Sequence, residues 1–233
     1  MTVRRLSSGI PGFDKMSEGG FKEGSVNLVC GGAGSGKTTF SIQFLVEGLR
    51  LGEPGIYITF EERREKLYSD MLGFGWDLEK YESMGLFKFV EYTPQQIKRV
   101  LVEGGGTLDA VITQMKAKRL VIDSITSFSL LFKDELTKKE SSLALFDLIN
   151  KWECTAILTS QAETFIGEQS YSQLHFEVDS IALVYHYQKR GLRHRAIEIL
   201  KMRGTKIPES IVELQISKKG IVVSPEKIMD EVE

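Results

Sequence analysis

Short apolar runs rich in β-branched residues alternate along the chain with longer amphipathic stretches. The pattern predicts strands at residues 26–30, 55–60, 87–90, 119–123, 155–159 and 180–187. Strands that alternate with helices in this way are typical of an α/β protein whose crossover helices cover a mainly parallel sheet. The length of 233 residues suits one such domain, which we expect to span residues 1–233.

Helices are predicted between these strands from apolar residues spaced three and four apart. The stretch 40–51 stops before Gly52, a residue suited to end a helix. Its apolar stripe consists of Ile42, Leu45, Val46 and Leu49. Similar stripes precede the strands at 119 and 155, and we expect all of them to pack into the core rather than to bind a cofactor.

Beyond residue 180 the pattern changes to successive strands with no long helix between them. These predicted strands cover residues 180–187, 195–202 and 211–216. The link 188–194, with Gly191 near its centre, predicts a hairpin turn. We therefore expect an antiparallel extension of the parallel sheet, followed by a charged and frayed tail from residue 226.

Composition and charge narrow the class of protein. The chain is 42% hydrophobic and 27% charged, and no segment approaches the roughly 18 apolar residues of a membrane span. Nothing at its start reads as a secretory signal, so we expect a cytoplasmic protein with no membrane role. Cys30 and Cys154 lie in apolar runs and are expected to be buried thiols. The net charge of −2 gives no general attraction to nucleic acid.

A glycine-rich loop between the first predicted strand and the first long helix matches the pattern G-x-x-x-x-G-K-[ST]. The loop, called the P-loop below, consists of Gly31, Gly32, Ala33, Gly34, Ser35, Gly36, Lys37 and Thr38. Glycines allow the backbone N–H groups to surround a phosphate chain, and the start of the helix adds the positive end of its dipole. The pattern predicts an ATP-binding loop in which Lys37 contacts the β- and γ-phosphates, with Thr39 also part of the nucleotide site.

Asp123 ends the apolar run 120–123, at the sheet edge where the P-loop is expected. Together with the hydroxyl of Thr38, its carboxylate predicts a site for Mg²⁺. An aspartate at a strand end is also a common helix N-cap or turn residue. The combination with the P-loop favours the metal site.

Glu61 and Glu62 follow the strand predicted next after the P-loop helix. A carboxylate at this place can orient and deprotonate the water that attacks the γ-phosphate. A charged pair after a strand is also typical of a solvated loop, and the charge run continues through residues 63–66. The residues alone leave both interpretations open.

These motifs together resemble the RecA superfamily and, within it, the KaiC-like ATPases of archaea and bacteria. The resemblance covers nearly the whole chain. It rests on Ser8-Gly9-Ile10-Pro11-Gly12-Phe13-Asp14, Glu18-Gly19-Gly20, the P-loop, Thr59-Phe60-Glu61-Glu62, Asp123-Ser124 and Lys201-Met202-Arg203-Gly204-Thr205. The first and last of these motifs are far more specific than a P-loop alone.

The resemblance implies a RecA-like core that assembles into a homo-oligomeric ring, commonly a hexamer, with ATP at each subunit interface. It implies that Glu61 and Glu62 include the catalytic base, without distinguishing between them. It also implies that Lys201 and Arg203 act on the γ-phosphate bound by the neighbouring subunit. Gln161, after the strand 155–159, occupies the place where RecA-type recombinases use a glutamine to sense the γ-phosphate, and an ordinary amide at a strand end is the alternative interpretation.

Two departures from the family pattern limit what carries over. The circadian clock member has two such domains in tandem, whereas this chain has one. Its adjacent autophosphorylated Ser-Thr pair is absent, because the matching stretch here is His175-Phe176-Glu177-Val178-Asp179-Ser180. We therefore do not expect phosphorylation of the clock type.

The leading functional interpretation is a Mg²⁺-dependent ATPase whose ring acts on an unidentified protein partner. The alternative is a RecA-type recombination module that binds DNA, and a further possibility is a nucleotide-binding protein with little turnover. Recombinases present basic loops to DNA, but residues 152–188 contain no Lys or Arg. A basic cluster at 189–195 is typical of a solvated hairpin or an interface, so nucleic acid is not the expected partner.

Overall fold

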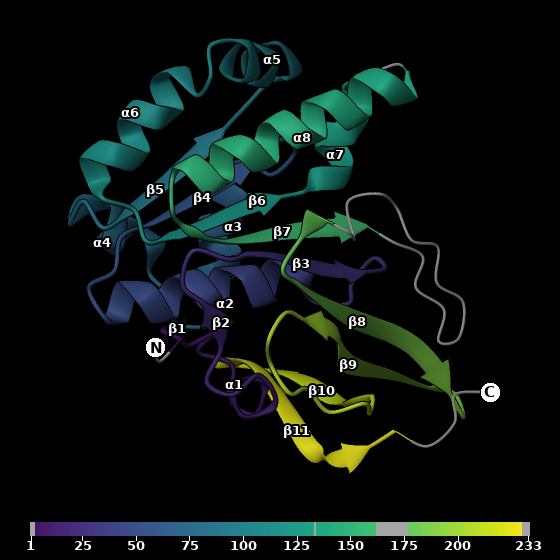
Figure 1. Ribbon diagram of the computed structural model, residues 1–233. Coiled ribbons are helices and arrows are strands. Elements are labelled where there is room, and N and C mark those ends of the chain that lie inside the picture. Colours follow the sequence, from purple (N-terminus) through teal and green to yellow (C-terminus); the bar gives the residue numbers. More distant parts are fainter. Residues whose placement is uncertain (1–2, 133, 162–176, 230–233) are drawn as a thin grey trace.

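The computed structural model describes residues 3–132, 134–161 and 177–229. Within them a nine-stranded sheet has the order β11-β10-β9-β8-β3-β7-β6-β4-β5 (Figure 1). Its strands are β3 (Val26–Gly31), β4 (Gly55–Thr59), β5 (Phe87–Glu91), β6 (Arg119–Asp123), β7 (Thr155–Gln161), β8 (Ser180–Lys189), β9 (Leu192–Met202), β10 (Val212–Ser217) and β11 (Gly220–Ile228).

The sheet has a parallel half and an antiparallel half. Strands β5, β4, β6, β7, β3 and β8 pair in parallel, and β9, β10 and β11 then follow β8 in antiparallel succession. The prediction of an α/β fold with a mainly parallel core and an antiparallel C-terminal extension is confirmed. No helix in the described part of the chain is long and apolar enough to cross a lipid bilayer.

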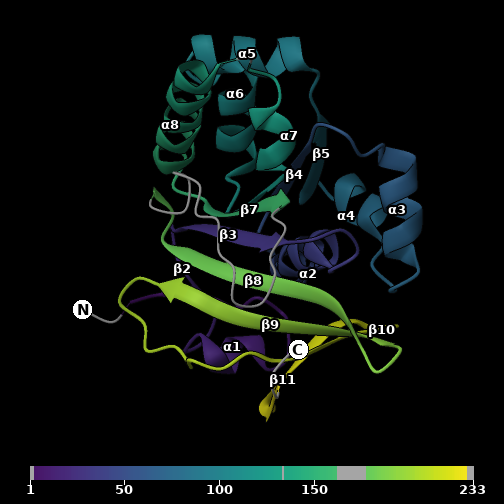
Figure 2. The ribbon, with the colours of Figure 1, turned by 90° about the vertical axis from the view of Figure 1, so that its right-hand side faces the viewer.

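Helices cover both faces of the sheet (Figure 2). One face packs against α2 (Lys37–Arg50), α3 (Arg64–Leu72) and α4 (Leu78–Ser83). The other packs against α5 (Pro94–Val102), α6 (Gly106–Met115), α7 (Ile125–Ser129) and α8 (Glu135–Lys151). Neighbouring residues of β3 divide between the two cores, because side chains alternate along a strand: Val29 joins the first core, and Leu28 and Cys30 join the second.

The N-terminal segment packs beside the antiparallel half. It forms a two-stranded sheet of β1 (Arg5–Leu6) and β2 (Phe21–Lys22), with the short helix α1 (Phe13–Met16) between them. Phe13 and Phe21 are buried against Phe40 of α2, with ring centroids 5.1–6.4 Å apart. The segment therefore extends the core that lies beneath the P-loop helix.

The cysteines behave as the sequence predicts. Cys30 and Cys154 are both buried. Burial raises the pKa of the Cys30 thiol to about 12 and that of Cys154 to about 11. Both therefore stay protonated near neutral pH and serve as apolar packing residues.

Several boundaries differ from the predictions. Helix α2 begins at Lys37 rather than at residue 40, so the end of the P-loop is already helical. The β8–β9 turn is only Arg190-Gly191, both with positive φ, and the strands on either side are longer than predicted. The predicted frayed tail was wrong for residues 226–228, which belong to β11, whereas residues 230–233 lie outside the described part.

Arg119 fixes the start of β6 from inside the protein. Its side chain is fully buried and forms an ion pair with Glu53 at 2.7 Å. It donates hydrogen bonds to the carbonyl oxygens of Ser7 and Phe44, each at 2.7 Å, and its guanidinium lies 4.5 Å from the Phe44 ring centroid. Gly48 leaves the space for this side chain, since a Cβ there would lie 2.3 Å from Arg119 Nε.

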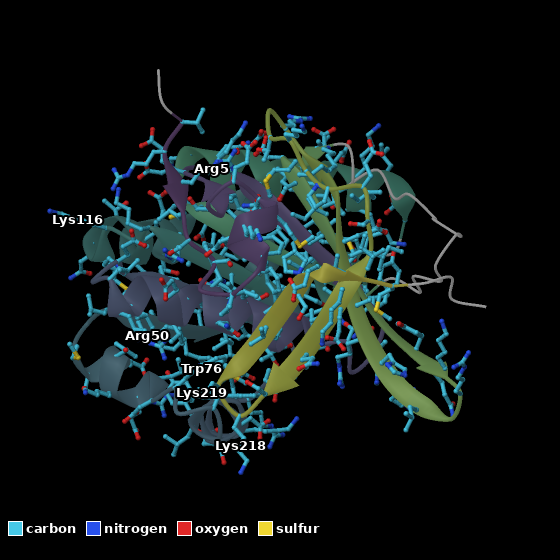
Figure 3. All side chains as sticks on the ribbon, turned by 90° about the horizontal axis from the view of Figure 1, so that it is seen from below. Arg5, Arg50, Trp76, Lys116, Lys218 and Lys219 are labelled. Atoms are coloured by element: carbon cyan, nitrogen blue, oxygen red, sulfur yellow. The ribbon has the colours of Figure 1, made fainter. Side chains whose placement is uncertain are left out.

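This packing predicts that Gly48→Ala destabilises the protein. Alanine normally stabilises a helix interior relative to glycine by about 1 kcal/mol, but here the added methyl group would displace a buried arginine. We expect the free energy of unfolding in urea to fall by about 1–3 kcal/mol. Arg50→Ala, on the exposed side of the same helix (Figure 3), should change it by no more than about 0.5 kcal/mol. A stability of Gly48→Ala equal to or above wild type would contradict the assigned packing.

Candidate functional site

The carboxyl ends of four parallel strands meet at one edge of the sheet. In this register Gly31 at the end of β3 is level with Gln161 of β7, and Thr59 at the end of β4 is level with Asp123 of β6. The segments that follow these strands therefore lie next to one another. Ligands of open α/β sheets bind at this kind of edge.

The P-loop connects β3 to α2 with a conformation that needs glycine. Gly34 and Gly36 have φ values of 70° and 109°. Gly36 is the N-cap of α2, and no side chain caps this helix, so its first N–H groups have no side-chain acceptor. A Cβ on Gly36 would lie 3.0 Å from Ile216, while a Cβ on Gly32 would meet nothing within 4 Å. The loop therefore packs against the protein at Gly36, whereas there is open space next to Gly32.

Lys37 lies across the P-loop. Its Nζ donates a hydrogen bond to Gly32 O at 2.9 Å. Burial lowers the pKa of Lys37, and the nearby Asp123 carboxylate acts in the opposite direction. Because burial has already removed part of the hydration of this ammonium, pairing with an anion costs little further desolvation energy.

Three hydroxyl groups converge on the Asp123 carboxylate. Thr38 Oγ1 and Tyr57 OH each donate to Oδ2 at 2.8 Å, and Thr159 Oγ1 donates to Oδ1 at 2.5 Å. Tyr57 is fully buried, and burial together with Asp123 raises the pKa of its phenol well above 10. These bonds fix the carboxylate next to Thr38, as the sequence predicts for a metal-binding pair.

The outer side of the P-loop is held by the β8–β9 hairpin. His186 and Arg195 are paired in register on these strands. His186 Nδ1 lies 3.3 Å from Ala33 O, and Arg195 Nε donates to Gly34 O at 3.0 Å. The C=O and the following N–H of a trans peptide point in opposite directions. Carbonyls held on the outside therefore turn the next N–H groups toward the inside of the loop.

The two glutamates have different surroundings. Glu61 Oε1 accepts a hydrogen bond from Ser127 Oγ at 2.6 Å, on the turn that follows Asp123. Glu61 is itself exposed, whereas Glu62 is partly buried and forms an ion pair at 3.2 Å with the exposed Lys66. Glu62 also borders a hollow of about 450 Å³ between α2 and α3, together with Thr38 and Thr39.

Gln161 lies at the same edge. It is the last residue of β7, its side chain is exposed, and its backbone N–H donates to Thr126 Oγ1 at 2.8 Å. The same hydroxyl lies 3.2 Å from Ser160 Oγ. Gln161 is therefore beside the P-loop and beside the turn after Asp123, where its side chain is accessible.

Lys201 and Arg203 are not part of this edge. Lys201 belongs to strand β9, which ends at Met202, and Arg203 occupies the following turn. Its Nη1 lies 3.6 Å from Asp179 Oδ1, and its N–H donates to Asp179 O. Asp179 in turn contacts the start of β3, with its Oδ2 accepting from Val26 N at 3.0 Å. Arg203 thus lies at the opposite end of β3 from the P-loop.

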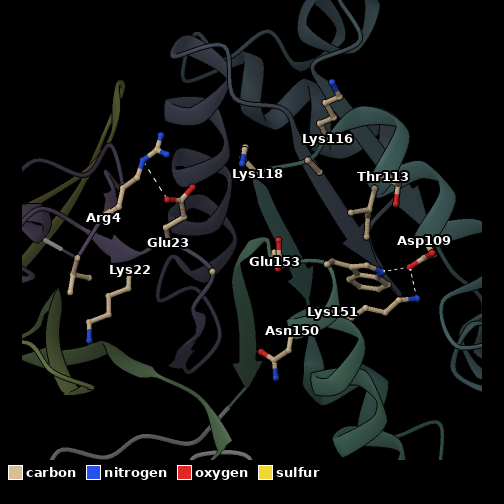
Figure 4. Close-up of a pocket in the computed structure, with 15 residues that line it drawn as sticks. Arg4, Lys22, Glu23, Asp109, Thr113, Lys116, Lys118, Asn150, Lys151 and Glu153 are labelled. Atoms are coloured by element: carbon tan, nitrogen blue, oxygen red, sulfur yellow. Dashed lines mark hydrogen bonds and ion pairs between the residues drawn. The ribbon is translucent and has the colours of Figure 1, made fainter. Parts of the chain in front are cut away.

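A larger hollow, of about 980 Å³, opens at that opposite edge between β1–β2 and the ends of α6 and α8 (Figure 4). Lys116, Lys118 and Lys151 are among the residues that line it. Lys151 and the indole Nε1 of Trp152 both contact Asp109, at 3.1 and 2.9 Å. Lysines at the C-terminal ends of α6 and α8 complement the helix dipoles there, so their clustering needs no ligand.

Some predictions fall outside the described residues. Of the stretch 152–188, considered for DNA binding, residues 162–176 lie outside the described part. His175, in the stretch that replaces the clock phosphorylation sites, also lies outside. In the described residues no group of three or more His, Cys, Asp or Glu forms a metal cluster. A single divalent ion held by one carboxylate, one hydroxyl and phosphate oxygens needs no such cluster.

Sequence reasoning missed five of the side chains that shape the site. They are Tyr57, Ser127, Thr159, His186 and Arg195. Tyr57 and Thr159 read as strand core, and the other three contact the site only through the tertiary fold. A polar residue inside an apolar strand, as at Thr159, is a weak signal that could have drawn attention to that position.

Comparison with known proteins identifies the family. The family model described as "ATPase: KaiC" matches residues 6–228. A UPF0273 protein of Pyrococcus furiosus is 35% identical over 97% of this chain and 96% of its own length. The crystal structure of a KaiC-like protein from Pyrococcus horikoshii OT3 is 38% identical, with a TM-score of 0.86, and covers 96% of this chain and 100% of that one.

Clock proteins are similar over only part of their length. Circadian clock protein KaiC3 of Synechocystis sp. is 37% identical over 96% of this chain but only 46% of its own length. The chain therefore spans about half the length of the clock relatives and nearly all of the UPF0273 relative. The fold, the family model and the relatives agree with the resemblance drawn from the motifs, and the chain belongs to the KaiC family of ATPases.

Proposed function

We propose that the chain is a Mg²⁺-dependent ATP hydrolase that works as a single ATPase domain in a homo-oligomeric, hexameric ring. The observation that carries this proposal is the 2.8 Å hydrogen bond between Thr38 Oγ1 and Asp123 Oδ2, beside the uncapped start of α2. A hydroxyl and a carboxylate at the N-terminus of a P-loop helix are the protein ligands that a nucleotide-bound Mg²⁺ requires.

The phosphate chain is assigned to the P-loop, residues 31–38, with Thr39 on the following turn of α2. Backbone N–H groups and the helix dipole favour an anion there. Lys37 would exchange its bond to Gly32 O for the β- and γ-phosphates. The contacts of His186 and Arg195 on the outside of the loop support the same assignment, because they leave its inner side free for phosphate.

Mg²⁺, when bound, would stabilise negative charge on the β- and γ-phosphoryl oxygens. The chain's own contribution is to hold Thr38 and Asp123 in position. Tyr57 and Thr159 fix the Asp123 carboxylate from the protein side and leave Thr38 facing the P-loop. Outer hydrogen bonds of this kind orient metal ligands in many sites.

We assign the general base to Glu61 rather than Glu62. Glu61 accepts a hydrogen bond from Ser127 on the turn that follows Asp123, whereas the Glu62 carboxylate pairs with the exposed Lys66. A base must be oriented toward the attacking water, and a carboxylate with a buried hydrogen-bond donor meets this need better. Gln161 at the end of β7 is the candidate sensor of the γ-phosphate.

Lys201 and Arg203 are assigned to the nucleotide of the neighbouring subunit. Arg203 is separated from its own P-loop by the length of β3. A heterologous interface that joins this edge of one subunit to the P-loop edge of the next repeats around a closed ring. The product of the ATPase cycle would then be a change of ring shape, read by a protein partner that is still to be identified.

Lys37→Ala should abolish tight ATP binding, because it removes the ammonium that the loop aims at the β- and γ-phosphates. Titration calorimetry with ATP and Mg²⁺ measures the affinity directly. Lys219→Ala, an exposed lysine at the β10–β11 turn (Figure 3), removes the same charge elsewhere and should bind like wild type. Unchanged affinity of Lys37→Ala would refute the P-loop assignment.

Glu61→Gln should retain ATP and lose hydrolysis by roughly 10²-fold or more, since the amide keeps the shape but cannot accept the proton. Glu62→Gln should lose far less, because it removes a carboxylate already paired with Lys66. Phosphate release under saturating ATP separates the two. Wild-type turnover in Glu61→Gln, with loss in Glu62→Gln, would move the base to Glu62.

A mixture of Lys37→Ala and Arg203→Ala proteins tests the shared site. Each variant should be inactive alone, since one lacks the loop lysine and the other lacks the cation that stabilises charge on the γ-phosphoryl oxygens. After subunit exchange, about one interface in four pairs an intact loop with an intact arginine, and activity should reappear. If mixtures shown to contain hybrid rings stay inactive, Arg203 does not act on the neighbour's nucleotide.

A further inference from the structure

We infer that Ser127, supported by Ser124, is the positioning residue that holds Glu61 in its catalytic orientation. This inference rests on the proposed ATPase function and adds to it the pair of residues that orients the base. Neither serine lies in the P-loop. Both belong to the first turn of α7, immediately after Asp123.

The strand register brings Glu61 to this turn. Thr59 and Asp123 are level at the ends of β4 and β6. Thr59 Oγ1 then accepts the backbone N–H groups of Glu61 and Glu62, at 3.3 and 3.1 Å, which folds the segment after β4 back over the strand end. Glu61 is thereby directed toward the first turn of α7.

The direction of each hydrogen bond follows from which of the side chains carries a proton to donate. The Glu61 carboxylate can only accept when ionised, so Ser127 Oγ donates its single proton to Oε1 at 2.6 Å. Ser124 Oγ, 2.8 Å from Ser127 Oγ, must then donate its own proton to Ser127. Ser124 Oγ also accepts the Ser127 backbone N–H at 3.2 Å as the N-cap of α7. The chain therefore runs from Ser124 through Ser127 to Glu61.

Burial shields the two serine hydroxyls of this chain, while the Glu61 side chain that accepts from Ser127 is exposed. Ser124 and Ser127 are only 5% and 6% exposed, so water competes weakly for their hydroxyls. Hydrogen bonds in a series polarise one another and gain strength in a setting of low dielectric. The second carboxylate oxygen of Glu61 is left for the attacking water. Glu62 has no comparable contact in the described structure, since its recorded side-chain partner is the exposed Lys66.

The same turn of α7 also serves the other side of the site. Thr126 Oγ1 accepts the backbone N–H of Gln161. Residues 126 and 127 thus tie the ends of β7 and β4 to the segment that follows Asp123. This arrangement supports a positioning role for Ser127, because a turn held from both sides keeps the Glu61 carboxylate that it contacts in one orientation.

The test compares Ser127→Ala with Ser129→Ala. Ser129 lies on the same helix, and its hydroxyl bonds only its own helix carbonyl, Ile125 O, among the recorded contacts. Ser127→Ala should lower kcat for ATP about tenfold to a hundredfold. Its affinity for ATP, measured by calorimetry, should stay within about twofold of wild type, since the P-loop is untouched. Ser129→Ala should match wild type in both, and Ser127→Thr, which keeps the hydroxyl, should restore much of kcat.

The decisive measurement repeats Ser127→Ala in the Glu61→Gln background. A residue that acts through Glu61 should cost less than about twofold there, because the base it positions is already gone. Equal losses in both backgrounds, or a kcat of Ser127→Ala equal to that of Ser129→Ala, would overturn the inference while the ATPase assignment stands. Absence of ATP hydrolysis in the wild-type protein would overturn both.

Discussion

The site depends on one shared hydrogen-bond acceptor, the Asp123 carboxylate. It receives hydroxyls from α2, β4 and β7 through Thr38, Tyr57 and Thr159. These elements come from distant parts of the chain, and the carboxylate holds them in one register at the edge of the sheet. The fully buried Arg119 fixes the other end of the same strand through Glu53 and two backbone carbonyls. A strand anchored at both ends gives the site a rigid base.

What could be predicted from the sequence is local or periodic. The P-loop is a contiguous motif in which glycines are needed for the backbone conformation. Asp123 ends a strand that is visible in the sequence as an apolar run. The parallel core and the antiparallel extension follow from the presence or absence of helices between strands. Helix α5 is also marked locally, since Thr93 and Gln96 form a capping box at its start.

What could not be predicted depends on pairing between distant segments. Arg195 contacts Gly34 only because the β8–β9 register sets it opposite His186, and a shift of one residue would turn both side chains to the other face. Strand β11 was missed because Pro225 and a charged run argue against a strand. Both are tolerated there, since β11 is the edge of the sheet and needs only one partner. The contact of Ser127 with Glu61 likewise depends on the pairing of β4 with β6, which no local pattern shows.

The proposed active-site residues are divided between the two edges of the sheet, so one chain does not bring all of them to its own P-loop. The P-loop edge has Glu61, Glu62 and Asp123, and Lys37 is its cation within the loop. Arg203 is level with the start of β3, and five steps along that strand, roughly 16 Å, separate Val26 from Gly31. An arginine side chain cannot cover that distance and remain paired with Asp179. If Arg203 contacts a γ-phosphate, the phosphate must therefore belong to a second copy of the chain, and catalysis becomes inseparable from assembly.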